Sequence, residues 1–561
     1  MVNVKNLFGM AVMATALVGC SSNDNLAPDG KDNVGKTGEA YASFRINLPT
    51  TTGTRADDPT PGTPSFEHGT AAEYEVKNGT ILIFDATTEK FVTSANLGTM
   101  NPWTDVKTNG VTTSAIATVK LENVKVGGNY KALVLLNNNV DATTEKVKLP
   151  TDAETYAAWS KDASKVDAEK YVSTDGIFMA NAPKYESAKE DPTTLVKINH
   201  VCASPEEAQA KAATVVYVER GLAKVTMKDF TTGGYPIGDG TYAGAKVEIK
   251  NWQLDVTNKS TFPVHQTAGL NSWSEIWNTP RFYDGTNATF KRVYWGVDPN
   301  YDKATYQTLE NCKTAFNMIK KENVVGLAGL ANPQYCLENT FDLNNMKQGQ
   351  TTRVVFKAVF TPKGITTGET FYKIGNNTAI WTEERLKQQI KTVALTAMGI
   401  TNADEQGKYG VDLTKGTNIS GKAGQHLVEA ANITYSGDAA SSKVTGEVVN
   451  TINEKLGLSA EVGISTYLNG EAYYIARIKH FNELTHWNAG EAYGTDNGKY
   501  LGRYGVLRNN WYDLSVTSVS GLGYPDVPEV KPELPDDEND QYINVEVKIL
   551  DWAKRSQSID L

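Results

Sequence analysis

Six histidines and four cysteines are the residues of this chain best suited to catalysis or metal binding, and their spacing indicates neither. The closest histidines, His480 and His486, are six residues apart, which does not place both rings on one face of a helix. The chain contains no phosphate-binding loop motif, no H-E-x-x-H zinc motif and no G-x-S-x-G nucleophile motif. We therefore expect no catalytic residue, no metal site and no cofactor.

Three weaker groups of residues leave alternatives open. Asp298 and Asp302 flank a short turn and could offer oxygen ligands to a hard cation, or could simply form that turn. Cys312 and Cys336 could form a disulfide or remain free buried thiols. A group of tryptophans could stack on a sugar, although such rings more often belong to a β-sandwich core: Trp273, Trp277 and Trp295.

The N-terminus carries a targeting signal. Lys5 precedes an apolar run from Leu7 to Val18, which is too short to span a bilayer and is typical of an export signal. The run ends in Ala16-Leu17-Val18-Gly19-Cys20, which resembles the lipobox where a bacterial lipoprotein is cleaved and acylated on its cysteine. Residues 1–20 are therefore predicted to be a lipoprotein signal peptide, with Cys20 as the lipidated residue. An ordinary secretory signal is the alternative.

A candidate strand and a candidate cleavage site follow the signal. The chain alternates between apolar and polar residues over 41–48. Its apolar face consists of Ala42, Phe44, Ile46 and Leu48. Residues 49–64 then form a loop of Thr, Pro, Gly and Asp with one basic residue, Arg55, and exposed loops are where proteases cut. The Arg55–Ala56 bond is a candidate processing site or an ordinary bond beside a loop arginine.

Near the end of the chain, apolar and polar residues alternate again, after a segment that we call the tether. Its apolar face consists of Ile543, Val545, Val547 and Ile549. The preceding residues, 525–540, include four prolines, seven acidic residues and a single lysine. Proline and like charges favour an extended, solvated segment. We therefore expect the final strand to leave its own domain and pair with a neighbour's sheet, as a donor strand.

Composition and pattern indicate the fold class. A chain of 561 residues is long enough for two or three domains, and its Gly, Tyr, Thr and Asn content favours β structure with many turns. The net charge of -10 argues against nucleic acid as a partner. Strand patterns without regular βαβ alternation predict a mainly β protein of antiparallel sandwiches with helical insertions. The expected strands include 80–85, 113–121, 130–137, 246–256, 352–361, 472–479 and 511–519, and the expected helices 152–170, 302–321, 382–398 and 450–456.

Several stretches together resemble the fimbrillins of type V pili of Bacteroidales, most closely the stalk subunit of the short (minor) fimbriae. The lipobox at Cys20 and the first strand with its Arg55 loop match the ends of a fimbrillin propeptide. Three internal stretches and the final block add to the resemblance: Glu219 to Val225, Glu338 to Thr340, Gly505 to Leu514 and Asn544 to Leu561.

The resemblance implies two transthyretin-like antiparallel β-sandwiches and an assembly cycle. A lipoprotein precursor would reach the outer membrane, an Arg-specific protease would cut after Arg55, and the lost strand would be replaced by a neighbour's donor strand. The implied partners are other copies of the chain, accessory fimbrillins, the protease and the outer membrane, and the implied destination is a surface fimbrium for adhesion. The expected divisions are the signal peptide (1–20), the spacer with the removable first strand (21–55), the N-terminal β-sandwich (56–216), the C-terminal β-sandwich (217–524) and the tether with the donor strand (525–561). An accessory, tip or anchor fimbrillin and a surface glycan-binding lipoprotein are the alternatives.

Overall fold

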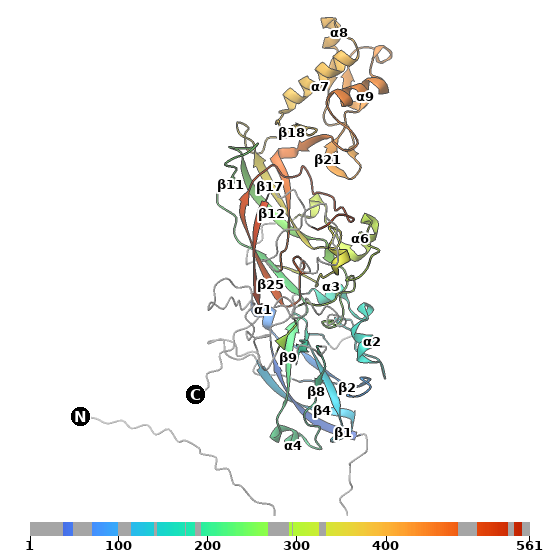
Figure 1. Cartoon of the computed structure of the whole chain (residues 1–561), viewed down its shortest axis with the longest axis vertical. Coiled ribbons are helices and arrows are strands. Elements are labelled where there is room, and N and C mark those ends of the chain that lie inside the picture. The colour runs from blue at the N-terminus through green and yellow to red at the C-terminus, as the bar shows by residue number, and fades with distance from the viewer. Residues whose placement is uncertain are drawn as a thin grey trace, which may run out of the picture.

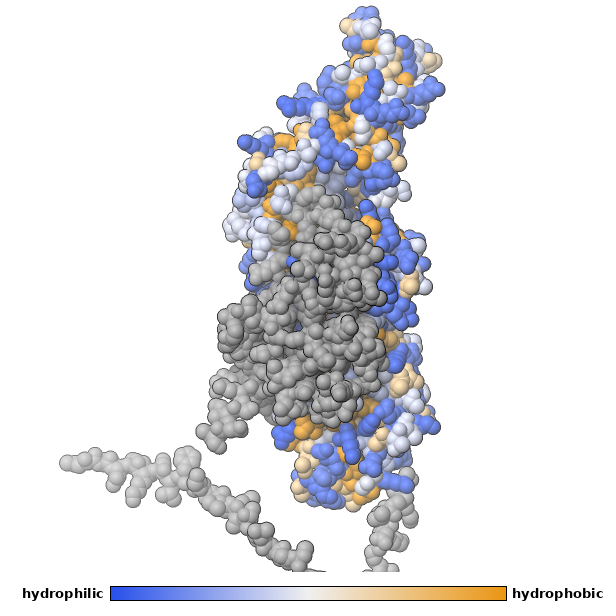
Figure 2. All heavy atoms as spheres, viewed as in Figure 1, coloured by the Kyte–Doolittle hydropathy of each residue, from blue (hydrophilic) through white to orange (hydrophobic). Residues whose placement is uncertain are grey.

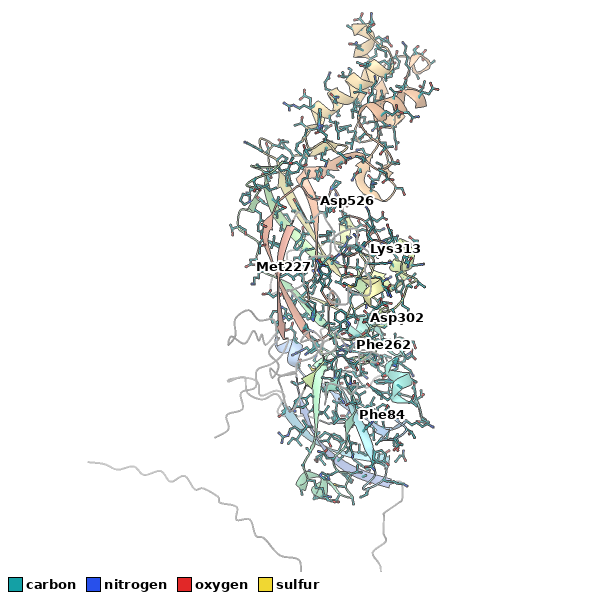
Figure 3. All side chains as sticks on the ribbon, in the orientation of Figure 1. Phe84, Met227, Phe262, Asp302, Lys313 and Asp526 are labelled. Carbon is teal, nitrogen blue, oxygen red and sulfur yellow. The ribbon has the colours of Figure 1, made fainter. Side chains whose placement is uncertain are left out.

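The structure is a computed structural model of the chain. It describes residues 38–48, 70–98, 114–139, 143–173, 176–185, 192–267, 291–293, 295–324, 333–480, 502–536 and 543–551. These parts form an elongated body with a first β domain at one end, a second β domain in the middle and a helical insert at the far end (Figure 1). Figure 3 follows the side chains along this body, from Phe84 in the first domain to Asp526 near the insert.

The first domain is one 8-stranded sheet folded over its own core. The strands follow the order β3-β2-β5-β6-β9-β1-β4, and β8 pairs with β5. The two ends of this order, β3 and β4, also contact each other. The strands are β1 Gly38–Asn47, β2 Gly79–Asp85, β3 Phe91–Asn96, β4 Ser114–Val124, β5 Tyr130–Leu136, β6 Met179–Asn181, β8 Val196–Lys197 and β9 Thr214–Arg220.

Short helices cover the outer face of this sheet. Leu82 and Phe84 of β2 belong to a second buried cluster, which includes Trp159 of α2 (Tyr156–Ser160) and Tyr171 of α3 (Ala168–Tyr171). Burial on both faces explains why β2 and β5 read in the sequence as continuous apolar runs rather than alternating ones.

Polar caps divide the segment that was predicted as one helix over 152–170. Thr155, Asp162 and Asp167 each accept a hydrogen bond from a backbone N–H two or three residues further along. Each cap starts a new short helix, because its side chain satisfies donors that only a helix N-terminus leaves free. The single predicted helix is therefore wrong, and α2, a 3-10 turn at 163–165 and α3 replace it.

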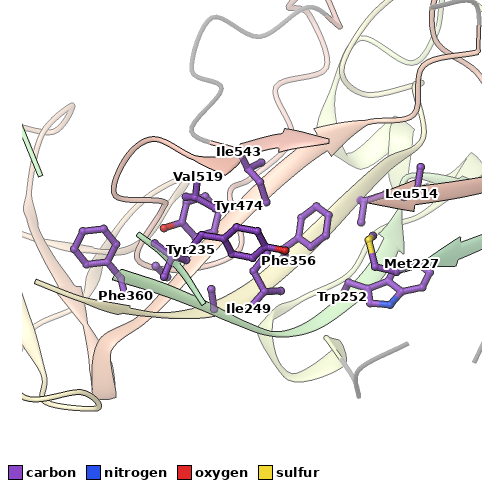
Figure 4. Close-up of a cluster of buried hydrophobic side chains, with 14 of the residues drawn as sticks. Met227, Tyr235, Ile249, Trp252, Phe356, Phe360, Tyr474, Leu514, Val519 and Ile543 are labelled. Carbon is purple, nitrogen blue, oxygen red and sulfur yellow. The ribbon is translucent and has the colours of Figure 1, made fainter. Parts of the chain in front are cut away.

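The second domain is a pair of facing 4-stranded sheets. One has the order β16-β10-β25-β26, with β10 Ala223–Met227, β16 Gln334–Cys336, β25 Asn510–Val519 and β26 Ile543–Asp551. The other has the order β11-β12-β17-β24, with β11 Tyr235–Pro236, β12 Lys246–Asp255, β17 Arg353–Thr361 and β24 Glu471–Arg477. Figure 4 shows their shared core, where Met227 and Leu514 of the first sheet lie with Trp252 and Phe356 of the second. The mainly β, sandwich-like fold predicted from the sequence is confirmed.

Two pairs of strands depart from the antiparallel pattern. β1 runs parallel to β9, and β10 runs parallel to β25. β9 and β10 are consecutive in the chain, so the change of sheet occurs at Gly221 and Leu222. The expected boundary between residues 216 and 217 falls inside β9, which stays in the first sheet until Arg220. The backbone pairing of β9 with β6 fixes this position, and side-chain pattern alone does not reveal it.

The insert lies between β17 and β24 and has its own core. Its helices are α7 Glu383–Ala397, α8 Ala403–Gly407 and α9 Gly446–Lys455, and its strands are β18 Phe371–Ile374, β19 Tyr409–Val411, β20 Asn418–Ile419, β21 Lys422–His426, β22 Ile433–Tyr435 and β23 Ile464–Tyr467. In the view of Figure 2, hydrophilic residues cover much of this end, with hydrophobic residues at its join to the sandwich. The predicted helices over 382–398 and 450–456 are confirmed as α7 and α9.

The helix predicted over 302–321 is wrong in extent. Only α6, Leu309–Ala315, is helical, and Thr308 caps its start. The following residues form β15 (Phe316–Asn317), which pairs with β13 (Thr257–Asn258). Strand pairing therefore ends the helix early. The remaining small elements are α1 Ala71–Tyr74, α4 Pro205–Ala210, β7 Lys184–Tyr185 and β14 Lys291–Arg292.

We predict that Gly221→Ala destabilises the junction between the two domains. A Cβ atom at Gly221 would lie 1.9 Å from the buried Tyr171 hydroxyl oxygen, so the ring or the backbone must move. Overpacking of this kind costs about 1–3 kcal/mol. Thermal unfolding of the variant should show a lower Tm. The control is Gly446→Ala at the start of α9, where a Cβ meets open space, and it should leave the Tm unchanged or slightly raised. Equal effects of the two substitutions would contradict the account.

Candidate strand-acceptor site

β1 is held between β4 and β9 in the first domain. It pairs antiparallel with β4 along its length and parallel with β9 from Phe44 to Asn47. Among the described strands, β4 is hydrogen-bonded only to β1. Unpaired backbone groups at a sheet edge are costly when buried and prone to pair when exposed. Removal of β1 would therefore open edges on both β9 and β4.

The inward residues of β1 are buried in the domain core. Ala42, Phe44 and Ile46 have no exposed surface, and Leu48 is 2% exposed. They belong to the same hydrophobic cluster as residues of β2, β4, β5 and β9. The structure therefore places all four residues of the predicted apolar face at the core. The release of this strand by proteolysis stays a prediction.

The outward face of β1 has one covered position, Ser43. The Ser43 hydroxyl donates to the carbonyl oxygen of Ala208 at 2.9 Å and lies 2.8 Å from the Thr118 hydroxyl oxygen. Ala208 belongs to α4, which packs over β1 and β4. Ser43 is 7% exposed, whereas Arg45, two residues on, is exposed. The outward face is thus a small polar slot followed by open surface.

Charged groups at the two ends of β1 contribute little to its hold. The Glu39 carboxylate lies 2.5 Å from the Lys120 ammonium of β4, and this hydrogen bond raises the pKa of Lys120. Both side chains are exposed, where such pairs are weak. Arg45 lies in register between Ile116 of β4 and Val215 of β9, which are 53% and 39% exposed. Burial and backbone pairing, not charge, fix β1.

The predicted donor strand lies in its own domain in this single chain. β26 pairs antiparallel with β25, from Ile543 opposite Val519 to Asp551 opposite Asn510, and forms the edge of its sheet. The Ile543 side chain is 4% exposed and enters the core of the second domain (Figure 4). The expectation that the strand leaves its own domain is therefore not met in the isolated chain. β25 pairs with β10 on one side only, so its other side can accept β26 as the edge strand of the sheet.

The first part of the tether is bound, contrary to the expected solvated segment. Arg353 donates to the carbonyl oxygen of Pro528 at 2.6 Å, and Arg477 donates to that of Asp536 at 3.0 Å. The Thr351 hydroxyl donates to the Asp536 carboxylate at 3.1 Å, and Asp536 is fully buried. Arginines on β17 and β24 thus bind backbone carbonyl oxygens of the tether. The prediction of a solvated tether considered only its proline and acidic content and did not include these contacts. Residues 537–540 of the tether lie outside the described residues.

Three sequence stretches that carried the fimbrillin resemblance meet at the domain junction. The Arg508 guanidinium lies 3.1 Å from the Glu338 carboxylate, and both side chains are buried. The backbone N–H of Arg220 donates to the Asn509 side chain at 3.1 Å. Stretches near residues 220, 338 and 508 are therefore joined by buried polar contacts, although they are far apart in the sequence.

Sequence reasoning missed Glu73, which completes this junction from α1. Its carboxylate lies 2.8 Å from the Lys224 ammonium and accepts a hydrogen bond from the Tyr335 hydroxyl. Lys224 also lies 3.5 Å from the centre of a Trp511 ring, a cation–π contact. Burial lowers the pKa of Arg220 to about 10, and the Glu73 charge opposes that change. No sequence pattern marks Glu73, because its partners come from distant strands.

The junction carries a third buried pair. The Glu219 carboxylate lies 2.7 Å from Nδ1 of His265, whose Nε2 lies 3.2 Å from the carbonyl oxygen of Trp295. Burial by itself would lower the pKa of Arg508, but the neighbouring Glu338 charge raises it above its usual value. Breaking one partner of a buried ion pair typically costs about 3–5 kcal/mol. Loss of one partner from any of these pairs would therefore destabilise the junction.

The candidate cation ligands do not come together. Asp298 is buried and accepts hydrogen bonds from the Asn258 side chain at 2.7 Å and from the backbone N–H groups of Thr340 and Asn300. Burial raises the pKa of Asp298 to about 7, against these hydrogen bonds, which favour the carboxylate. Asp302 has a side chain that is 71% exposed. Within the described ranges, no group of His, Cys, Asp and Glu is arranged to hold a metal ion.

The other open alternatives are partly settled. Trp295 is fully buried against Phe341, so its ring is a core residue and not a sugar platform. Cys312 and Cys336 are both free and buried, and burial raises their pKa values to about 11 and about 12. Several predicted sites lie outside the described residues: Cys20, Arg55, Ala56, Trp273 and Trp277. In the part of the chain that the structure describes, no helix is long and apolar enough to cross a membrane.

The end of the second domain matches a known family. Residues 465–558 match the sequence model of Fimbrillin_C, described as major fimbrial subunit protein type IV, fimbrillin, C-terminal. The C-terminal region therefore resembles a fimbrillin C-terminal domain. The match spans β24, β25, the tether and β26, so the predicted donor strand lies inside the fimbrillin domain. The fimbrillin resemblance predicted from the sequence is confirmed, and the coarse function that accompanies it is that of a cell-surface fimbrial subunit.

Other comparisons add little. A proposed cell adhesion protein of Parabacteroides distasonis ATCC 8503 is 12% identical, with a TM-score of 0.37, over 92% of this chain and 99% of that one. Another from Bacteroides eggerthii DSM 20697 is 10% identical, with a TM-score of 0.34, over 93% and 99%. At these TM-scores the arrangements differ too much to assign a shared function. Comparison with curated proteins found no significant match.

We predict that Phe44→Ala in the uncleaved precursor destabilises the first domain by about 3–5 kcal/mol, because the ring is fully buried between β4 and β9. Denaturant unfolding measures this change in free energy. Arg45→Ala on the same strand is the control and should stay within about 0.5 kcal/mol, since Arg45 is exposed. A large loss in the control, or none in the first variant, would show that β1 is not seated as described.

Proposed function

We propose that the chain is a structural fimbrial subunit that polymerises head-to-tail by strand exchange. The precursor is exported as a lipoprotein through acylation of Cys20 and reaches the outer membrane. An Arg-specific protease cuts after Arg55 and releases the lipid together with β1. The donor strand of another copy then fills the vacancy, and the product is a surface fimbrium that supports adhesion. Its partners are further copies of the chain and accessory fimbrillins.

The observation that carries this proposal is the dependence of β4 on β1. The match of residues 465–558 to the fimbrillin C-terminal model supports a fimbrial subunit, and the pairing of β1 supplies a way to join copies. The predicted cut lies only seven residues beyond Leu48, so it would detach β1 without cutting another described strand. The cut subunit would expose an apolar trough with two open edges, which is a strand-addition site.

The donor strand gains pairing when it moves into the trough. In its own domain β26 lies at a sheet edge and pairs with β25 alone. In the position of β1 a strand has two neighbours, β4 and β9. Full burial of the four apolar donor side chains in the trough contributes roughly 1.5–3 kcal/mol each, or about 6–12 kcal/mol before ordering costs. The move gives up the burial that the strand already has in its own domain, where Ile543 is 4% exposed. A second ladder of hydrogen bonds adds to this. Each copy gives one strand and receives one, so the contact need not close and an open filament results.

The bound tether limits how far the strand can reach. Asp536 is held by Arg477 and Thr351, and Ile543 lies seven positions further along the chain. An extended chain of this length spans at most about 25 Å. If the contacts of Asp536 persist, the acceptor must lie this close to the donor's second domain. A short and stiff joint between subunits is the consequence.

We expect Arg55→Ala to block processing. The precursor would keep β1 in the groove, remain attached to the outer membrane and form no polymer. Immunoblots of cell fractions with unheated samples show both the size of the subunit and any ladder of polymers. Arg55→Lys is the control for residue specificity, and it should also fail if the protease requires arginine. Normal ladders from Arg55→Ala would remove this bond from the assembly cycle.

We expect Val547→Asp to leave the subunit processed but unable to donate, because a charge would enter an apolar groove. Burying an unpaired carboxylate costs several kcal/mol, so the polymer yield should fall at least about tenfold. The matched control is Lys548→Asp, which places the same charge on the adjacent, outward position. Sedimentation of polymer after protease treatment measures the yield. Equal yields for Val547→Asp and the parent protein would take the donor role away from this strand.

A further inference from the structure

We infer that the donor strand enters the groove in the same direction as β1 and in one register, with Asn544 at the place of Ser43. The inference rests on the proposed function, and its occupant is a second copy of this chain. It assigns to the outward face of the groove a role in setting the register. The inward apolar residues alone cannot set it, because they alternate uniformly along the donor.

The covered slot under α4 is selective. In the precursor it holds Ser43, which is 7% exposed and touches both the Ala208 carbonyl oxygen and the Thr118 hydroxyl. After β1 leaves, both groups still need a partner in the rebuilt sheet. A buried carbonyl without one costs about 1–3 kcal/mol. The slot therefore favours a small, uncharged side chain that can both donate and accept.

Only one outward residue of the donor meets this requirement. The outward set is Asn544, Glu546, Lys548 and Leu550. An ionised glutamate only accepts and would face a carbonyl oxygen, and leucine neither donates nor accepts. Lysine can donate but would bring a charge beneath α4. The Asn544 amide can donate to the Ala208 carbonyl and accept from the Thr118 hydroxyl.

This register also aligns the inward faces. Counting from Asn544 at Ser43, each apolar donor residue falls on one residue of the strand it replaces: Ile543 on Ala42, Val545 on Phe44, Val547 on Ile46 and Ile549 on Leu48. The two sets have nearly the same total side-chain size, with bulk moved from the Phe44 position to the Ala42 position. Cores tolerate such exchanges when the total volume is kept.

The remaining outward residues fall on open surface. Glu546 takes the exposed place of Arg45, and Lys548 takes the half-exposed place of Asn47. The sequence continues the correspondence upstream of the strand, with Tyr542 at Tyr41 and the acidic Asp540 at Glu39. The same offset therefore reproduces residue type at the Tyr41 and Glu39 positions, whereas Gln541 falls on the buried Ala40 and Glu546 on Arg45.

A reversed strand is the competing arrangement. Run in the opposite direction, the donor still offers four apolar residues to the groove, but Lys548 then occupies the slot and Asn544 takes the place of Asn47. The reversed strand buries an ammonium under α4 and loses the upstream correspondence. The two arrangements differ at the residue opposite Ser114 of β4, because Ser114 pairs with Asn47 in the precursor.

Disulfide trapping reads this difference in the assembled polymer. Directly opposite residues on neighbouring strands have Cβ atoms close enough for a disulfide after small adjustments. Ser114→Cys is combined in turn with Lys548→Cys, Asn544→Cys and Leu550→Cys in the processed, polymerised protein. The native cysteines of the described chain are buried and free, which keeps the background low. After mild oxidation, ladders in non-reducing gels should form with Lys548→Cys and be at least about fivefold weaker with the other two.

Two substitutions that each introduce an aspartate test the slot under α4. Asn544→Asp should lower polymer yield at least about tenfold, because a carboxylate would face the Ala208 carbonyl. Lys548→Asp should change it by less than about twofold. The reversed arrangement predicts the opposite order. Circular dichroism of the unpolymerised precursors confirms that both variants fold, so a loss of yield reports on the joint.

The outcomes separate the register from the proposed function. Fibres that cross-link through Asn544→Cys would show a reversed strand, and fibres that cross-link through Leu550→Cys would show a strand shifted by two residues. Either result overturns the inferred register and keeps strand exchange. Fibres that form normally but cross-link through none of the donor cysteines would show that β26 does not occupy the groove, which overturns both.

Discussion

The pairing of β4 with β1 is the contact on which the rest of the account depends. Every other described strand of the first sheet has a neighbour that lies beyond the predicted cut, but β4 has β1 alone. β1 also supplies a row of buried side chains to the core of that domain. A subunit that loses β1 would therefore be incomplete in both backbone pairing and packing, and a strand from elsewhere would meet both needs.

The second domain is built to present such a strand from a fixed base. Buried polar contacts join it to the first domain, between Glu73 and Lys224 and between Glu219 and His265, and arginines of β17 and β24 hold the tether as far as Asp536. The segment that separates Asp536 from the donor strand is only six residues long. In the isolated chain β26 covers β25 and is itself the edge of its sheet, so one side of the strand stays open to further pairing.

Sequence reasoning succeeded where the determining interactions are local. The alternation of β1, β4 and β26 and the helical pattern of α7 are set by nearby residues, and these elements were predicted. It failed where distant groups decide. Asp162 divided a helix, Arg353 and Arg477 captured a tether that composition marked as solvated, and β9 stayed in the first sheet past the expected boundary. The junction around Glu73 has no sequence signal, because six separate segments supply its members.

A cryo-electron microscopy map of the assembled polymer tests the central claim most directly. The account predicts continuous density that leaves the second domain of one subunit near Asp536 and lies between β4 and β9 of the next, with apolar side chains pointing into that core. Density for the last strand still paired with β25 of its own domain, together with β1 retained between β4 and β9, would contradict the account.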